Sequence, residues 1–383
     1  MIKQPVPMLY FFLFILFLLF FIYSLTLDKE NRTIALVMGI VLFLLVALRR
    51  DDVGPDTLGY IQQFLDPYHK SLFGREEESL YRWWVTFWSE LNLNSQSYLF
   101  VCAIASVGFV LLCMWQLSKN RVWTYTFFLV VFSWYFYLTG IRQSLSMGCF
   151  TVGTYFLSRN LDSISLKSIF FLFRWENLSA LVFLVLSPMF HSTALFADTV
   201  LLLALLSPPK GRWLYISSII VSFIICLTAT FRDAEEILQY MFNYVSKDVE
   251  ILYRYSGYVE LDYLYDTSLY LILKSALPIN FIALFSFTIC KKDYDLQERL
   301  FFWLVLVNNL FFYFSYLFRL KMFLYPAAAI AIANMLWPIL QRKRYLCYRI
   351  ILVLFVVLCA YTSYINLIKQ PEFDYKFFLP SMF

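Results

Sequence analysis

Ionisable side chains at the edges of long apolar segments are the residues of this 383-residue chain best suited to chemistry. Arg142 stands in the polar break LTGIRQSLS, Arg319 lies in the stretch YLFRLKMF, and His191 is one of two histidines. An arginine in such surroundings needs an acidic partner or an anionic ligand, and its planar guanidinium matches phosphate oxygens. The arginines therefore predict a site for an anion such as pyrophosphate.

Candidate proton acceptors occur in the same parts of the sequence. Asp56 and Glu78 lie in the segment that also holds Arg49 and Arg50. Either carboxylate, or His191, is a candidate general base that would activate a hydroxyl. Each residue also has an ordinary structural explanation, since arginines at helix ends often reach lipid headgroups and a lone histidine is usually structural. It is the group, rather than any one member, that favours a function.

Other kinds of site are not indicated. The chain has ten glycines and no glycine-rich phosphate loop, and no acidic motif is paired with histidine to hold a metal. Its seven cysteines lie in or beside apolar runs and form no C-x-x-C pair. We expect no metal and no cofactor. A donor substrate would be a membrane-resident lipid pyrophosphate rather than a sugar nucleotide.

Composition indicates a helical membrane protein. Hydrophobic residues make up 61% of the chain, charged residues 15%, and the mean hydropathy is +0.68, which a soluble domain could not accommodate. The formal charge of +5 falls in short clusters between apolar runs, as in membrane-protein loops, so no nucleic-acid partner is expected. We predict an all-α, polytopic helical bundle that forms a single integral membrane domain over residues 1–383.

Apolar runs close to the length of a membrane span predict about a dozen transmembrane helices. They cover residues 8–27, 33–48, 97–117, 123–139, 143–158, 175–187, 189–206, 213–230, 268–290, 300–317, 320–340 and 347–366. Pro188 should break the helix there, and residues 160–174 are predicted to be an interfacial amphipathic helix.

Loop charges predict the orientation. Every second loop, from 28–32 to 341–349, is denser in Lys and Arg than the opposite set, and is therefore assigned to the cytoplasm. Two long loops, about 49–96 and 231–267, then lie outside, as do both termini and the candidate site residues. These loops are rich in Trp and Tyr, which suit either interfacial anchors or platforms for sugar rings.

Several short motifs occur in a defined order. After the second apolar run, an arginine is followed by G-x-D-x-x-x-Y, in which the pattern residues are Gly54, Asp56 and Tyr60. An E-x-x-Y segment that should open a helix follows at Glu78 and Tyr81.

The later motifs are I-R-Q at the start of a helix, an H-S pair, and a loosened R…Y-P element. Their residues are Ile141, Arg142 and Gln143, then His191 and Ser192, then Arg319, Tyr325 and Pro326. In order and spacing, residues 33–330 resemble the EpsG family of Wzy-type polysaccharide polymerases, which build O-antigen, capsule or exopolysaccharide.

The resemblance implies a metal-independent membrane glycosyltransferase of the bacterial plasma membrane, with its active site facing the periplasm or exterior. Its donor and acceptor would be glycans linked to undecaprenyl pyrophosphate, and its further partners membrane lipids and a chain-length regulator protein. The expected substrate-binding residues are Arg49, Arg50, Tyr60, Tyr81, Arg142, Gln143, Arg319 and Tyr325. The base would be Glu78, Asp56 or His191, and a carboxylate is favoured because glycosyl transfer commonly uses one.

Three other functions remain open. A flippase or transporter of the lipid-linked unit would place polar groups at mid-membrane in two related halves, and the sequence shows neither feature. A ligase or a related glycosyltransferase is hard to separate from a polymerase by sequence. A scaffold for an assembly complex would leave the arginines without a role.

Overall fold

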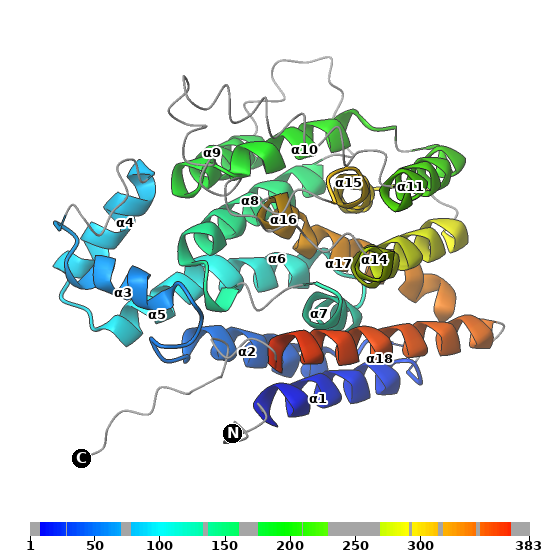
Figure 1. Cartoon of the computed structure of the whole chain (residues 1–383), viewed down its shortest axis with the longest axis horizontal. Coiled ribbons are helices and arrows are strands. Elements are labelled where there is room, and N and C mark those ends of the chain that lie inside the picture. The colour runs from blue at the N-terminus through cyan, green and yellow to red at the C-terminus, as the bar shows by residue number, and fades with distance from the viewer. Residues whose placement is uncertain are drawn as a thin grey trace.

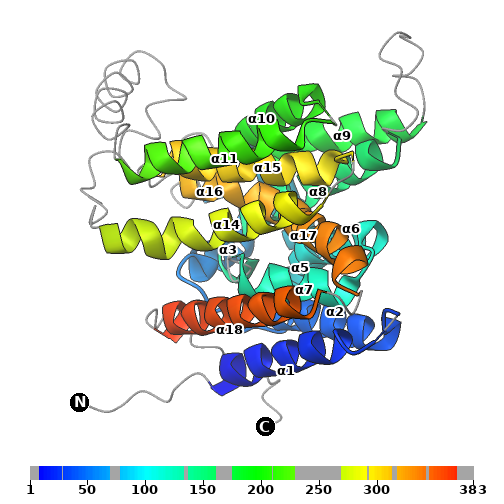
Figure 2. The ribbon, with the colours of Figure 1, turned by 90° about the vertical axis from the view of Figure 1, so that its right-hand side faces the viewer.

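Helices are the only regular elements in the described part of the chain, which agrees with the all-α prediction. The computed structural model describes residues 8–27, 29–69, 78–132, 137–160, 175–208, 210–228, 269–290, 293–312, 317–341 and 345–368. The helices are arranged in stacked layers (Figures 1 and 2).

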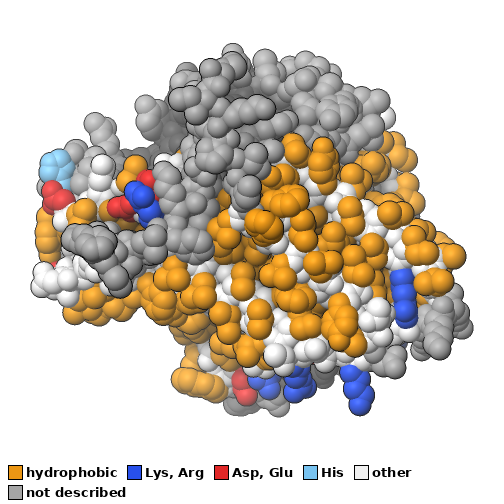
Figure 3. All heavy atoms as spheres, turned by 90° about the horizontal axis from the view of Figure 1, so that it is seen from below, with side chains coloured by type: hydrophobic (Ala, Val, Ile, Leu, Met, Phe, Trp, Pro, Cys, Tyr) orange, Lys and Arg blue, Asp and Glu red, His pale blue; other side chains and the backbone are white. Residues whose placement is uncertain are grey.

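The first layer consists of α1 (Met8–Ser24), α2 (Arg32–Ala47) and α18 (Leu346–Ile368), with α7 (Arg121–Val130) packed on its inner side. Figure 3 shows its outer face covered by apolar side chains, with basic side chains near one edge. Phe12, for example, is 60% exposed. Water would not tolerate such a surface, whereas a lipid bilayer would.

The centre of the molecule is α17 (Tyr325–Leu340), which is buried along nearly its whole length. Its small side chains, in the sequence AAAIAIA, let α15 (Leu296–Leu310) and α14 (Leu269–Ile289) approach closely. A capping box at the start of α15, between Asp295 and Glu298, satisfies the first backbone N–H groups of that helix.

The opposite layer contains α8 (Ile141–Asn160), α9 (Trp175–Phe190), α10 (Ala194–Leu206) and α11 (Arg212–Leu227). Helix α8 packs along α9, and Ser146 and Ser187 join the two by hydrogen bonds between buried hydroxyl and carbonyl groups. Gly148 lets α8 meet the π-helical turn Ile104–Gly108 between α5 (Ser95–Ala103) and α6 (Phe109–Leu117), since a Cβ there would lie 2.3 Å from the Ala105 carbonyl oxygen.

Some predicted boundaries need correction. The segment predicted as a loop at 49–96 contains the amphipathic helices α3 (Thr57–Leu65) and α4 (Ser79–Glu90), which lie at one end of the bundle (Figure 1). Pro188 does not break its helix: α9 continues through it and ends two residues later, at Phe190. The span predicted at 123–139 ends at Val130. Most of the predicted interfacial helix at 160–174 and the whole second long loop at 231–267 lie outside the described residues.

Three helices of the described chain are long and apolar enough to cross a membrane unaided: Ser95–Leu117, Arg319–Leu340 and Leu346–Leu367. Shorter apolar helices accompany them at Leu9–Ser24, Arg32–Ala47, Trp175–Phe190, Ala194–Leu206, Arg212–Leu227 and Ala276–Ile289. The predicted number of about twelve spans is therefore not confirmed, although the helical and apolar character is.

Candidate functional site

A buried carboxylate joins two residues that are distant in the sequence. The Glu78 side chain, 9% exposed, places Oε2 3.1 Å from Nη1 of Arg142 and Oε1 3.1 Å from Nδ1 of His191. The backbone N–H of Ser192 also donates to Oε1, at 3.1 Å. We call Glu78, Arg142 and His191 the Glu78 cluster.

Helix ends position the three members. Glu78 is the N-cap residue of α4, Arg142 is the second residue of α8, and His191 directly follows α9. The paired serines Ser146 and Ser187 lie about one turn from Arg142 and His191 respectively, so the α8–α9 contact fixes the spacing of these two side chains. Both predicted helix starts, after Glu78 and at Ile141, are confirmed.

The environment sets the charge states of the cluster. Burial acts most strongly on Glu78 and by itself would raise its pKa, but the hydrogen bond with His191 and the positive charge of Arg142 together lower that pKa to about 2. Burial lowers the pKa of His191, helped by the charges of Arg142 and Arg319, and the hydrogen bond with Glu78 only partly opposes this. At neutral pH Glu78 is thus an anion and His191 is neutral.

Neutral His191 has one arrangement that satisfies Glu78. Because the carboxylate can only accept, Nδ1 must carry the proton that it donates to Oε1 of Glu78. The lone pair of the imidazole then resides on Nε2. A histidine oriented by a buried carboxylate in this way can accept a proton from a bound hydroxyl group.

Helix α16 (Leu317–Lys321) contributes to the surroundings of the Glu78 cluster. The buried Gln143 side chain, next to Arg142, donates from Nε2 to the carbonyl oxygen of Arg319 at 2.7 Å. The Arg319 side chain is exposed, and its charge reaches His191. Lys321, two residues later, instead points into the core and donates to Oδ1 of Asn308 at 3.1 Å.

Tyrosines pack beneath the Glu78 cluster. The guanidinium carbon of Arg142 lies 5.8 Å from the ring centroid of Tyr81. Tyr81 is fully buried, donates its hydroxyl to Oε1 of Gln63 at 2.9 Å, and meets the Tyr60 ring edge-on at 5.9 Å between centroids. Helices α3 and α4 thereby supply a polar and aromatic support for Arg142.

The G-x-D-x-x-x-Y motif holds the start of α8. Gly54 has φ +93°, and a Cβ there would lie 2.5 Å from the carbonyl oxygen of Leu138, so only glycine fits without displacement. Thr57 donates its hydroxyl toward the same carbonyl at 3.1 Å, and the Asp56 N–H donates to Oγ1 of Thr139 at 3.2 Å. This turn docks on the residues directly before Arg142.

Four other predicted site residues have different surroundings. Arg49 is 1% exposed and donates to the carbonyl oxygen of Val46, while Arg50 is half exposed and pairs with Asp52. The Asp56 side chain is exposed at the start of α3. The remaining one belongs to the core: the Tyr325 ring, at the start of α17, stacks on Phe132 with 5.0 Å between centroids.

The sequence reasoning missed two supporting residues, Gln63 and Thr139. Each is buried and hydrogen-bonded to a motif residue, Gln63 to Tyr81 and Thr139 to Asp56. Their position was a usable signal, because Gln63 belongs to a polar pair between the apolar Ile61 and Phe64, and Thr139 lies two residues before the I-R-Q helix.

Comparisons with known proteins give one result. The model of the EpsG family matches residues 32–378. No curated protein and no solved structure matches. Since the match covers nearly the whole chain, including both helix starts that hold the Glu78 cluster, this chain belongs to the EpsG family, a membrane-protein family of the polysaccharide-polymerase type.

Proposed function

We propose that this protein is a polysaccharide polymerase. It transfers a growing glycan from undecaprenyl pyrophosphate to a sugar hydroxyl of an incoming lipid-linked repeat unit, on the outer face of the plasma membrane. Membership of the EpsG family supports the general activity. The observation that carries the proposal is the Glu78 cluster, in which an arginine and a neutral histidine share one buried carboxylate.

Arg142 and Arg319 stabilise the leaving pyrophosphate. As the bond between the anomeric carbon and the phosphate oxygen breaks, negative charge builds up on that oxygen, and preorganised cations lower the barrier. A guanidinium presents five donors, so it can pair with a carboxylate and a phosphate together. Arg319 is exposed beside the cluster and therefore suits a ligand arriving from outside the protein.

His191 acts as the general base. Nε2 takes the proton of the acceptor hydroxyl while the hydroxyl oxygen forms the new bond to the anomeric carbon. Glu78 stabilises the resulting imidazolium and holds the ring in place. A carboxylate with a pKa of about 2 is a weak base, so we assign Glu78 a positioning role and prefer His191 to the carboxylate that sequence reasoning favoured.

The proposed reaction needs no metal ion, because the arginines supply the positive charge that a divalent cation would otherwise provide. Tyr60, Tyr81 and Gln143 support the arginines by packing and hydrogen bonds. Arg49, Arg50, Asp56 and Tyr325 are assigned no direct contact with substrate.

The test is polymerisation by the purified protein in detergent, with a lipid-linked repeat unit, EDTA and no nucleotide sugar. A ladder of products on a gel is expected from the wild type and not from Arg142→Ala. The control is Arg32→Ala, which replaces an exposed arginine at the start of α2 and should leave the ladder intact. A normal ladder from Arg142→Ala would remove this residue from the site.

The same assay separates the alternatives. A flippase forms no glycosidic bond in detergent solution, so a ladder excludes transport as the sole activity. A ligase would transfer a finished glycan to a different acceptor and leave repeat units unjoined.

A further inference from the structure

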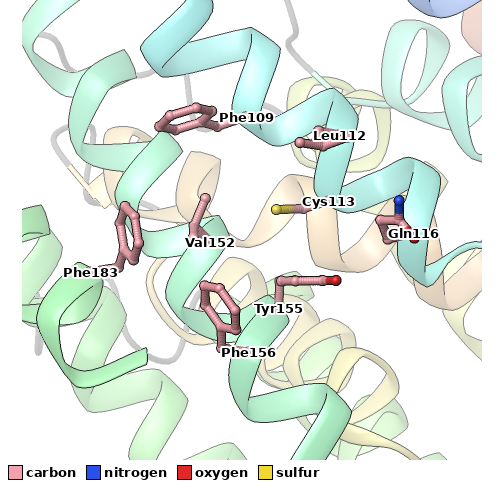
Figure 4. A pocket seen from close by; sticks show the side chains of 8 residues that line it. All are labelled: Phe109, Leu112, Cys113, Gln116, Val152, Tyr155, Phe156 and Phe183. Carbon is pink, nitrogen blue, oxygen red and sulfur yellow. The ribbon is translucent and has the colours of Figure 1, made fainter. Parts of the chain in front are cut away.

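An apolar cavity of about 260 Å³ lies between α6, α8 and α9 (Figure 4). Its walls include Phe109 and Leu112 of α6, Val152 and Phe156 of α8, and Phe183 of α9. Leu112 is 58% exposed, so the cavity reaches the apolar surface of the protein. Such a cavity opens toward lipid rather than toward water.

The cavity shares two walls with the helices that carry the Glu78 cluster. Arg142 and Val152 are ten residues apart on α8, and Arg142 and Phe156 fourteen, which at 1.5 Å per residue is about 15 and about 21 Å. On α9, Phe183 precedes His191 by eight residues, or about 12 Å. A ligand with an anionic head at Arg142 and a long apolar tail along α8 and α9 would reach the cavity.

We propose that this cavity holds the polyisoprenyl chain of the lipid-pyrophosphate substrate. The inference rests on the proposed function and adds a binding site for the lipid part of the substrate. The polyisoprenyl chain would anchor each donor so that its pyrophosphate stays beside Arg142 while the glycan is transferred to the acceptor.

Distance favours a polyisoprenyl chain over a phospholipid whose headgroup lies in the same leaflet as the Glu78 cluster. The hydrocarbon core of a bilayer is about 30 Å thick, so an acyl chain whose headgroup lies in the same leaflet reaches about 15 Å. The cavity begins about 12 Å from His191 along α9 and about 15 Å from Arg142 along α8, and it continues to about 21 Å from Arg142. A chain that starts at the Glu78 cluster must be longer than one leaflet to fill it.

The walls also suit a branched, unsaturated chain. The rings of Phe156 and Phe183 stack with 6.3 Å between centroids and an interplanar angle of 24°, forming one flat side. Methyl groups and double bonds pack favourably against ring faces. Tyr155 and Gln116 bring the few polar atoms of the lining.

The variant Val152→Phe tests the proposal by filling the cavity. Val185 is 52% exposed on α9, so Val185→Phe makes the same substitution on a lipid-facing surface and is the matched control. Polymerisation is measured with an undecaprenyl-linked and a farnesyl-linked repeat unit. For Val152→Phe we expect KM for the undecaprenyl donor to rise about tenfold through lost apolar contact, with KM for the farnesyl donor unchanged.

The proposal would be overturned if Val152→Phe raised KM equally for both donors, or if the ratio of the two KM values stayed as in the wild type. Native mass spectrometry with undecaprenyl phosphate supplies a readout that does not depend on activity. The wild type and Val185→Phe should retain this lipid in competition with phospholipid, and Val152→Phe should not. If phospholipid displaces it from the wild type, the cavity belongs to membrane lipid. Retained undecaprenyl phosphate without any polymerisation would instead count against the proposed function alone.

Discussion

Replacing Glu78 by glutamine distinguishes a positioning role from a role as the base. Glu78→Gln keeps the shape of the side chain and its capacity to accept from Nδ1 of His191, but removes the negative charge. A hydrogen bond to a charged group contributes about 1.5–3 kcal/mol and a neutral one about 1 kcal/mol. The imidazolium formed during transfer therefore loses about 0.5–2 kcal/mol, which corresponds to a fall in rate of about 2- to 30-fold.

The pH dependence gives the sharper result. Because Glu78 raises the pKa of His191 by its hydrogen bond and its charge, removing that charge lowers this pKa further below 6.5. Activity requires neutral His191, so the wild-type rate should fall as the pH drops through the pKa of His191. In Glu78→Gln this acid limb should move to lower pH.

The assay measures initial rates of polymerisation between pH 4.5 and pH 8. Glu90→Gln is the control, because Glu90 is the exposed last residue of the same helix α4 and accepts from Tyr68. If Glu78→Gln has no activity at any pH while remaining folded, Glu78 is the base and the reasoning fails. An acid limb that stays in place would also refute the coupling between the two side chains.

Three further predictions follow from the same contacts. Gly54→Ala should lower the free energy of unfolding by about 2–4 kcal/mol, through backbone strain and the clash with Leu138. The control is Gly59→Ala, where no neighbouring atom lies within 4 Å of the added Cβ and no such loss is expected. Equal melting temperatures for the two variants would contradict the conclusion that the Gly54 turn docks against Leu138. Arg142→Lys should polymerise at less than a tenth of the wild-type rate, because an ammonium cannot make the two parallel hydrogen bonds of a guanidinium. A wild-type rate in this variant would mean that residue 142 contributes to the reaction by its positive charge alone. The low pKa of Glu78 should contribute about 3 kcal/mol to the free energy of unfolding, fully present above pH 4.5 and lost as the pH falls toward 2. In Glu78→Gln the free energy of unfolding should not show this loss with falling pH. The same pH dependence in the variant and the wild type would show that the ion pair does not stabilise the fold.

Sequence reasoning was most successful where structure is local. The boundaries of α2, of α8 and of the helix pair α5–α6 agree with the predicted spans to within a few residues, because apolar runs of this length bury their backbone groups only as helices. It was less successful for α3 and α4, which are short and amphipathic and whose average composition resembles that of a loop.

Residue types were also informative about the candidate site. Arg142 and His191 were identified as polar residues beside apolar segments, and Glu78 was identified as a candidate base in the E-x-x-Y motif. Their order along the chain, together with Gly54 and Tyr60, carried the resemblance to the EpsG family.

Only the tertiary structure decided which of these groups meet. Arg319 and Lys321 stand two residues apart on one short helix, yet packing exposes the first beside the Glu78 cluster and buries the second against Asn308. Glu78 was predicted as a base, but its pairing with both Arg142 and His191 leaves it a firmly ionised partner. Helix formation depends on neighbours in sequence and on hydropathy, which the sequence displays directly. The charge state of a buried side chain depends on what distant segments place within a few ångströms of it, and only the packed helices determine that.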